Sequence, residues 1–342
     1  MSLLSAIRTG DVTELPSRRD EDWRWSDLRG LVRTMPGLSS GFDGEIPAGR
    51  FAGLVDEDHV LVNGGELTLT IGAGQSRTLG LRLISRGEGR HSTRVSINLE
   101  AGAQLALLET QDSDGASLVQ NTLTIEMAVG AKLERVLLVD DHAMAINVGQ
   151  TTVSLAPGAD YGQSVLTSGA RRQRLETHVS HPGGEAQLRL DGAYLLASKA
   201  HSDQTTVVTH TGLDGATRQL TKGVARDQAR AVFQGRIVVT EGADRTDARM
   251  AHHALLLSDQ AEVDSKPELE IYADDVACAH GNTVGAMDED ALFYACQRGI
   301  PESLARAMLA EAFIGEVLDR IVHEGAREAA LAWASERLSV AS

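Results

Sequence analysis

The segment LTLTIGAG (residues 67–74) begins a pattern that returns along the chain and decides the fold. Its strand-like part, LTLTI (67–71), is followed by Gly74. Three similar segments follow, each with its own glycine: VSINL (95–99) with Gly102, LTIEM (123–127) with Gly130, and TVSL (152–155) with Gly158. The step from one glycine to the next is the same each time, and each glycine comes three positions after an apolar residue. A repeat of about 28 residues indicates a solenoid, in which each unit buries its apolar face against its neighbours.

The repeat unit is made of strands and tight turns. Apolar and polar residues alternate, which places Leu67, Leu69 and Ile71 on one face. Glycine suits a corner that requires a positive φ or a close approach of two chains. Because the unit shows no helical period, the pattern favours a β-helix over leucine-rich or ankyrin arrays. A sandwich of hairpins is the alternative, although hairpins would not be expected to keep one spacing three times.

The chain divides into three predicted parts: an N-terminal arm (1–50), a β-helix core (51–285) and a C-terminal helical segment (286–342). In the arm, Trp23 and Trp25 interrupt a run of charge and are expected to dock on the core. At the other end, Asp288 can cap a helix that stops at Gly299, and Pro301 is expected at the first position of a second helix. A third helix over 326–338 has a weaker pattern. The fold class is therefore mainly β, with helical ends.

Composition limits the function. The net charge of −16 disfavours a large surface for nucleic acid. Two cysteines cannot build a disulfide framework, which favours a reducing compartment. We expect no signal peptide, because the N-terminus lacks a sustained apolar run, and no membrane span. These features predict a cytoplasmic protein.

Motifs for chemistry are scarce. We find no nucleotide-binding loop, no HExxH or paired CxxC motif, and no nucleophile elbow. His252 and His253 are adjacent, so on a strand their rings would point to opposite faces, and we assign them no ligand role.

The segment EIYADDVACAHGNTVG (270–285) differs, because an extended chain places Cys278 and His280 on one face, about 6.6 Å apart at Cα. Thiol and imidazole suit iron, zinc or copper(I), but two ligands do not complete a site. By chemistry alone, an inert cysteine beside a surface histidine is the simpler interpretation. A metal here would require ligands from a second chain.

Three longer runs resemble a known family. LLLSDQAEVDSKPELEIYADDVACAHGNTVGAMDEDALFYACQRGI (255–300) is similar to the C-terminal segment of the SufB/SufD family of iron–sulfur cluster assembly scaffolds, in its SufD form. KGVARDQARAVFQGRIVV (222–239) resembles the segment before it, and RRDEDWRWSDL (18–28) the N-terminal motif.

The resemblance implies a right-handed parallel β-helix and a complex with SufB and the ATPase SufC. SufB would pair with the β-helix, and SufC would dock on the C-terminal helices, about 288–322. His280 would lie where the nascent, transient iron–sulfur cluster is built between the chains, with Cys278 as a weaker companion. ATP hydrolysis would belong to SufC, which leaves this chain a non-catalytic scaffold.

Several alternatives stay open at this point. A β-helix enzyme acting on a carbohydrate or acyl group would need a carboxylate cluster or a catalytic histidine along its groove. A purely structural subunit would dock SufC and use His280 only for packing. Participation of a flavin, and a homodimer of the isolated chain through the surface meant for SufB, are also left open.

Overall fold

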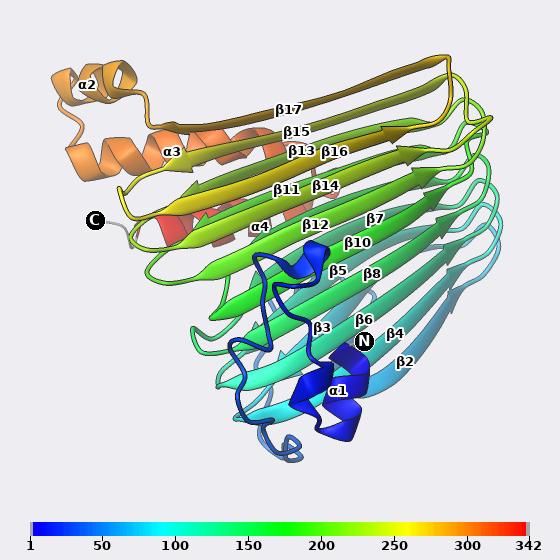
Figure 1. Cartoon of the computed structure of the whole chain (residues 1–342), viewed down its shortest axis with the longest axis horizontal. Helices are drawn as coiled ribbons and strands as arrows, with labels where there is room; N and C mark the ends of the chain where they lie inside the picture. The colour runs from blue at the N-terminus through cyan, green and yellow to red at the C-terminus, as the bar shows by residue number, and fades with distance from the viewer. Residues whose placement is uncertain (1–2, 340–342) are drawn as a thin grey trace.

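The computed structural model describes residues 3–339 and shows a parallel β-helix with helices at both ends, which confirms the predicted fold class (Figure 1). The strands of the described residues form two sheets. We call them the odd sheet, in the order β1-β3-β5-β7-β9-β11-β13-β15-β17, and the even sheet, in the order β16-β14-β12-β10-β8-β6-β4-β2. Their bounds are β1 (Glu57–Val62), β2 (Gly65–Ile71), β3 (Ser76–Ser85), β4 (Gly89–Leu99), β5 (Gln104–Ser113), β6 (Ser117–Met127), β7 (Lys132–Asp140), β8 (Ile146–Leu155), β9 (Asp160–Thr167), β10 (Arg172–His181), β11 (Gln187–Leu196), β12 (His201–His210), β13 (Ala216–Ala225), β14 (Arg230–Val239), β15 (Thr246–Leu256), β16 (Glu262–Ile271) and β17 (Val276–Ala286).

Each solenoid turn consists of one even strand and the odd strand that follows it. The predicted equivalence of successive units is confirmed, because Leu67 pairs with Val95 and Val95 with Leu123 in parallel register. The inward-facing apolar side chains of both sheets meet in a continuous core, in which Val95 and Ile97 are completely buried. Parallel strands buried in this way gain their stability from stacking on the next turn.

The repeated glycine corner is confirmed and continues beyond the glycines. Gly74, Gly102, Gly130 and Gly158 all have a positive φ between 66° and 69°. After Gly158 the same corner is occupied by Glu185, Asp214 and Arg245, with φ of 64°, 60° and 57°, at unequal spacings along the chain. Each non-glycine residue in this conformation costs on the order of 1 kcal/mol. The sequence pattern therefore fades although the architecture persists.

The interior also holds a buried ion pair. Glu109 on β5 and Arg135 on β7 lie 2.6 Å apart and are 1% and 2% exposed. The guanidinium group also donates to the side chains of Thr151 and Gln163 on the next solenoid turn. A buried pair is tolerated where its remaining donors are satisfied in this way.

The chain ends in three helices, of which the second and third cover the outer face of the odd sheet and the first projects beyond it (Figure 1). They are α2 (Glu289–Gln297), α3 (Glu302–Leu318) and α4 (Glu324–Ser339). Asp288 accepts hydrogen bonds from the first turn of α2, as predicted, and Gly299 follows with φ of 85°. Pro301 precedes α3 as its N-cap residue, one position earlier than predicted, because its ψ of 142° is extended. No helix within residues 3–339 is long and apolar enough to cross a membrane.

The N-terminal arm lies against the outer face of the even sheet (Figure 1). It contains α1 (Leu3–Thr9) and two short 3-10 helices, η1 (Val12–Glu14) and η2 (Glu21–Trp23). Its apolar residues, among them Ile7, Leu15 and Leu28, pack on outward-facing residues of β6 and β8 such as Leu118 and Val148. The two kinds of flanking segment thus occupy opposite faces of the β-helix.

Candidate functional site

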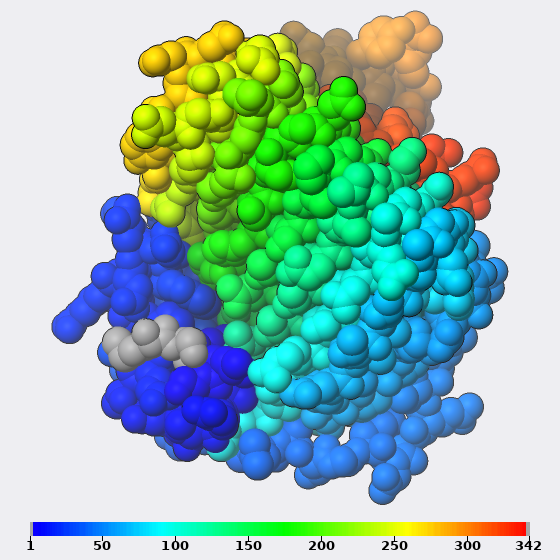
Figure 2. Space-filling model, turned by 90° about the vertical axis from the view of Figure 1, so that its right-hand side faces the viewer, coloured from blue at the N-terminus to red at the C-terminus, as the bar shows by residue number. Residues whose placement is uncertain are grey.

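The last solenoid turn is open. β16 and β17 end their sheets, so each strand is paired on one side only. In Figure 1 β17 forms the upper edge of the odd sheet, and Figure 2 shows the solenoid turns stacked in chain order with no further turn above the last one. Both strands are only partly buried or exposed along their length, unlike β14 and β15 of the turn before them. Interior-facing residues of this turn are therefore accessible from the end of the solenoid.

Cys278 lies at the apolar side of this open end. It pairs in register with the buried Ala248 and packs, half-buried, against the cluster that contains Phe233 and Met250. Burial raises the pKa of the Cys278 thiol, and the neighbouring Asp247 carboxylate acts in the same direction, while a backbone hydrogen bond with Ala248 opposes them. The thiol is therefore protonated at neutral pH unless a metal displaces the proton.

His280 lies two residues further along the same strand. It pairs in register with Met250, whose side chain is buried in the core, so alternation directs the imidazole toward the open interior. The residue is exposed. The structure thus brings Cys278 and His280 to one face of β17, as expected from their spacing.

A buried histidine beside this pair was missed from the sequence. His252 on β15 is completely buried, and its Nδ1 lies 2.7 Å from Oδ1 of Asn282 on β17. Its Nε2 lies 3.0 Å from the hydroxyl of Tyr194, and Ser265 on β16 approaches Nδ1 at 3.4 Å. Burial lowers the pKa of His252 to about 4, so the ring is neutral. His252 therefore connects the interior to both strands of the last turn.

His253 takes the opposite face, as predicted for adjacent strand residues. Its Nδ1 lies 2.7 Å from Oγ1 of Thr283, on the outer side of the same two strands. The hydrogen bonds of His252 to Asn282 and Tyr194 were not predicted, because only a ligand role had been considered for this residue. Alternation places Asn282 on the same strand face as His280, but its contact with His252 depends on the register of β15 and β17, which the sequence does not reveal.

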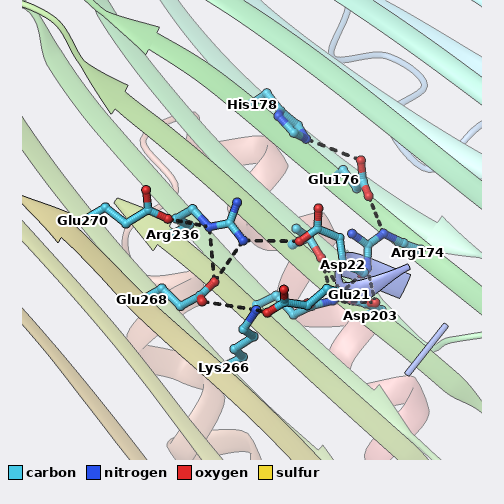
Figure 3. A network of polar contacts seen from close by, with 12 residues as sticks. Glu21, Asp22, Arg174, Glu176, His178, Asp203, Arg236, Lys266, Glu268 and Glu270 are labelled. Atoms are coloured by element: carbon cyan, nitrogen blue, oxygen red, sulfur yellow. Dashed lines mark hydrogen bonds and ion pairs between the residues drawn. The ribbon is translucent and has the colours of Figure 1, made fainter. Parts of the chain in front are cut away.

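The N-terminal arm reaches the neighbourhood of this turn, and Trp23 docks on the core as predicted, whereas the ring of Trp25 contacts Arg24 of the arm itself. Trp23 stacks on the guanidinium group of Arg174, 4.6 Å from the ring centroid. Arg174 is buried and forms ion pairs with Asp203 and Glu176 (Figure 3). Ser26 of the arm donates a 2.5 Å hydrogen bond to the same Asp203. The arm thus satisfies charges that the sheet alone would leave exposed.

Two further ion pairs join the arm to the last strands of the even sheet. Glu21 lies 2.9 Å from Lys266 on β16, and Asp22 lies 3.2 Å from Arg236 on β14 (Figure 3). Glu268 bridges both cations, at 3.1 Å from each. These pairs are partly exposed and contribute modestly to stability. They fix the arm beside the open end without covering it.

The ligand set of the open end is incomplete. Within residues 3–339 no group of three or more His, Cys, Asp or Glu residues is arranged to hold a metal ion. Cys296, the other cysteine, lies half-buried on α2. Imidazole and thiol are donors that suit iron, but Cys278 and His280 would need partners from outside the chain.

Comparison with known proteins adds a family to this geometry. A family model described as SUF system FeS cluster assembly, SufBD core domain, matches residues 83–313. The iron-sulfur cluster assembly protein SufD of Escherichia coli (strain K12) is 28% identical, with 98% of this chain and 91% of that protein aligned. A SufBD family protein of Mycobacterium leprae (strain TN) is 25% identical over 96% of this chain and 92% of its own length. SufD of Bacillus subtilis (strain 168) is 32% identical over 36% of this chain and 28% of its own length.

Proposed function

The chain belongs to the SufBD core family of the SUF iron–sulfur cluster assembly system, and from this we propose that it is a non-catalytic scaffold subunit that pairs with SufB. The predicted SufD form is supported by the E. coli and B. subtilis relatives. In this proposal a transient cluster, the cargo of the system, is built at the interface of the two chains. His280 is the principal ligand and Cys278 a weaker one. The observation that carries the proposal is the open last turn with an incomplete ligand set.

The edges of β16 and β17 suit pairing with another β-helix. An unpaired strand presents a row of free backbone donors and acceptors, and pairing with a partner strand satisfies them. Here two such edges end side by side, and they present the exposed Ile271 and Val284 beside the half-buried Leu269. A partner that continues both sheets would bury these residues and place its own side chains opposite His280.

The C-terminal helices suit a second partner, which we propose is SufC. Four large apolar side chains on α2 and α3 are between 50% and 65% exposed: Phe293, Tyr294, Leu304 and Met308. Leu304 and Met308 lie one turn apart on α3, so their side chains are neighbours on the helix surface. The buried Ile314 and Val317 lie further along the same helix, where it packs on the odd sheet. Exposed apolar groups gathered in this way are typical of an interaction surface.

The remaining parts of the proposal follow from the family role. The three parts of the chain, 1–50, 51–285 and 286–342, would serve as arm, scaffold and SufC-docking segment. ATP would be hydrolysed by SufC in the cytoplasm. The isolated chain would form a homodimer through the β16 and β17 edges when SufB is absent. A flavin is a second candidate ligand of the complex, tested by flavin fluorescence after the purified complex is denatured.

The central experiment compares His280→Ala with wild type in a complex co-expressed with SufB and SufC. We expect an intact complex that loses most of its iron and acid-labile sulfide, and a smaller loss for Cys278→Ala. His142→Ala, which removes an exposed histidine at a distant corner, is the matched control and should retain the cluster. A His280→Ala complex with normal iron and sulfide would instead favour the purely structural, SufC-docking alternative.

A separate variant tests the docking surface. Phe293→Ser removes the most exposed aromatic side chain of α2. We expect it to weaken retention of SufC while SufB still co-purifies, because the open end of the β-helix is unchanged. Turnover of a polysaccharide or an acyl ester by the isolated wild-type chain would support the enzyme alternative.

A further inference from the structure

We propose that Asn282 donates a hydrogen bond from its side-chain amide to a sulfide of the cluster at His280, and that His252 orients this amide. The inference rests on the proposed function, because it concerns the same open end. It adds one positioning residue and one hydrogen-bond donor to a site that otherwise consists of His280 and Cys278.

The hydrogen-bond chain fixes which end of the amide is free. A neutral imidazole has one donor and one acceptor nitrogen. Burial raises the pKa of the Tyr194 hydroxyl, which therefore keeps its proton and can donate to Nε2 of His252 at 3.0 Å. Nδ1 of His252 then carries the proton and donates to Oδ1 of Asn282 at 2.7 Å. The oxygen of the amide is engaged, and the NH2 group points away from His252.

His252 is held rigidly enough to impose this orientation. Its ring stacks on Phe233 with 4.5 Å between centroids and 2° between planes. At the Nε2 edge of His252 lies Tyr194, whose ring fills the space above Gly223, where a Cβ would lie 1.9 Å from ring atoms. The histidine is thus held by stacking on Phe233 and by a hydrogen bond at each ring nitrogen. The absence of a side chain at Gly223 is what allows Tyr194 to reach it.

The free end of the amide faces the site. Within residues 3–339 the NH2 group of Asn282 has no hydrogen-bond partner, and the residue is exposed at the open end. Asn282 and His280 lie on the same face of β17, about 6.6 Å apart at Cα from the rise of a strand. Sulfides of an iron–sulfur cluster accept hydrogen bonds, and these bonds help to set its reduction potential. A cluster bound by His280 would meet this donor.

The test uses the complex with SufB and SufC after iron–sulfur reconstitution, with reduction potential, iron–sulfur stretching frequencies and cluster loss to an iron chelator as readouts. Asn282→Ala removes the donor, and His252→Leu removes the group that orients it. We expect both to shift the potential to lower values, to shift the stretching frequencies, and to lose cluster about tenfold faster, as for one hydrogen bond to a charged group. His252→Asn retains a donor near Nδ1 and should restore much of the wild-type behaviour.

Thr283→Ala is the matched control, because it breaks the hydrogen bond with His253 on the outer face of the same two strands. It should leave the cluster signals unchanged. If Asn282→Ala behaves like Thr283→Ala while His280→Ala still loses the cluster, the inference is overturned and the proposed function stands. If wild type holds no cluster, or His280→Ala keeps it unchanged, both are overturned.

Discussion

Buried histidines predict that the fold weakens sharply in mild acid. Four of them are at most 7% exposed, and burial lowers their pKa values to about 3 or about 4: His91, His201, His210 and His252. When folding lowers the pKa of a histidine, the unfolded chain takes up the proton at a higher pH than the folded chain does. Its stabilising contribution is complete above the unfolded pKa of about 6.5 and is lost as the pH falls toward the folded value.

The magnitude follows from the same values. Between pH 7 and pH 5 the unfolded form of each histidine becomes almost fully protonated while the folded form stays neutral. Each group therefore lowers the free energy of unfolding by about 2 kcal/mol, or roughly 8 kcal/mol for the four. Burial raises the pKa of Asp141 to about 6, which opposes this loss by about 1 kcal/mol. The net loss is comparable to the whole stability of many domains.

Urea unfolding at pH 7 and pH 5, followed by far-UV circular dichroism, measures this loss. His210→Gln replaces a titrating ring with an amide that can still accept the hydrogen bond of Thr217, 3.0 Å from Nε2 in wild type. We expect its loss of stability between the two pH values to be smaller than that of wild type by about 2 kcal/mol. His142→Gln, at an exposed position, should follow wild type. Equal pH dependence of His210→Gln and wild type would refute the reasoning.

Three further predictions concern the scaffold and the arm. Gly183 has φ of 76°, and a Cβ there would lie 2.1 Å from the carbonyl oxygen of Leu213, whereas Gly102 has φ of 66° and open space around it. In urea unfolding we expect Gly183→Ala to lower the free energy of unfolding by about 3 kcal/mol or more and Gly102→Ala by about 1 kcal/mol. Equal losses for the two variants would contradict this distinction. Glu134 accepts hydrogen bonds from the backbone N–H groups of Val322 and His323 before α4, at 2.6 and 2.8 Å. Glu134→Ala should lower the free energy of unfolding by about 1 kcal/mol and leave the cluster content of the complex unchanged. A loss of cluster would disprove this purely structural role. Trp23→Ala removes the stacking on Arg174 and should speed trypsin cleavage of the arm severalfold, and an unchanged digestion rate would show that the ion pairs alone hold it.

The solenoid turns of the first half of the β-helix can be predicted from the sequence more readily than those of the second half. Where glycine occupies the corner, its regular spacing predicts the register of each solenoid turn. After Gly158 the corner is taken by Glu185, Asp214 and Arg245, residues that rarely adopt a positive φ. Their conformation is imposed by the neighbouring turns, so local sequence preference does not reveal it.

One part of the candidate site could likewise be predicted from the sequence, and another part could not. Cys278 and His280 are two residues apart on one strand, and alternation alone places them together. The contact of His252 with Asn282 depends on the cross-strand register of β15 and β17, which pairs these two residues. If the spacing of the glycine repeat had continued into this turn, His252 would have paired with His280 instead. A shift of even one residue would place Asn282 on the other face. The register, and with it the hydrogen-bond chain, could be found only from the structure.

The position of His280 constrains what a partner must provide. In the solenoid turn before it, the position in register with His280 is Met250, and the next inward-facing residue is His252, a buried imidazole that is satisfied by Tyr194 and Asn282. His280 has no such partner within residues 3–339 and tolerates this only because the end is open to water. A partner that covers the end with apolar side chains would bury an unsatisfied ring, at a cost of about 1–3 kcal/mol. A surface that pairs stably here must therefore bring a hydrogen-bond partner or a metal to His280.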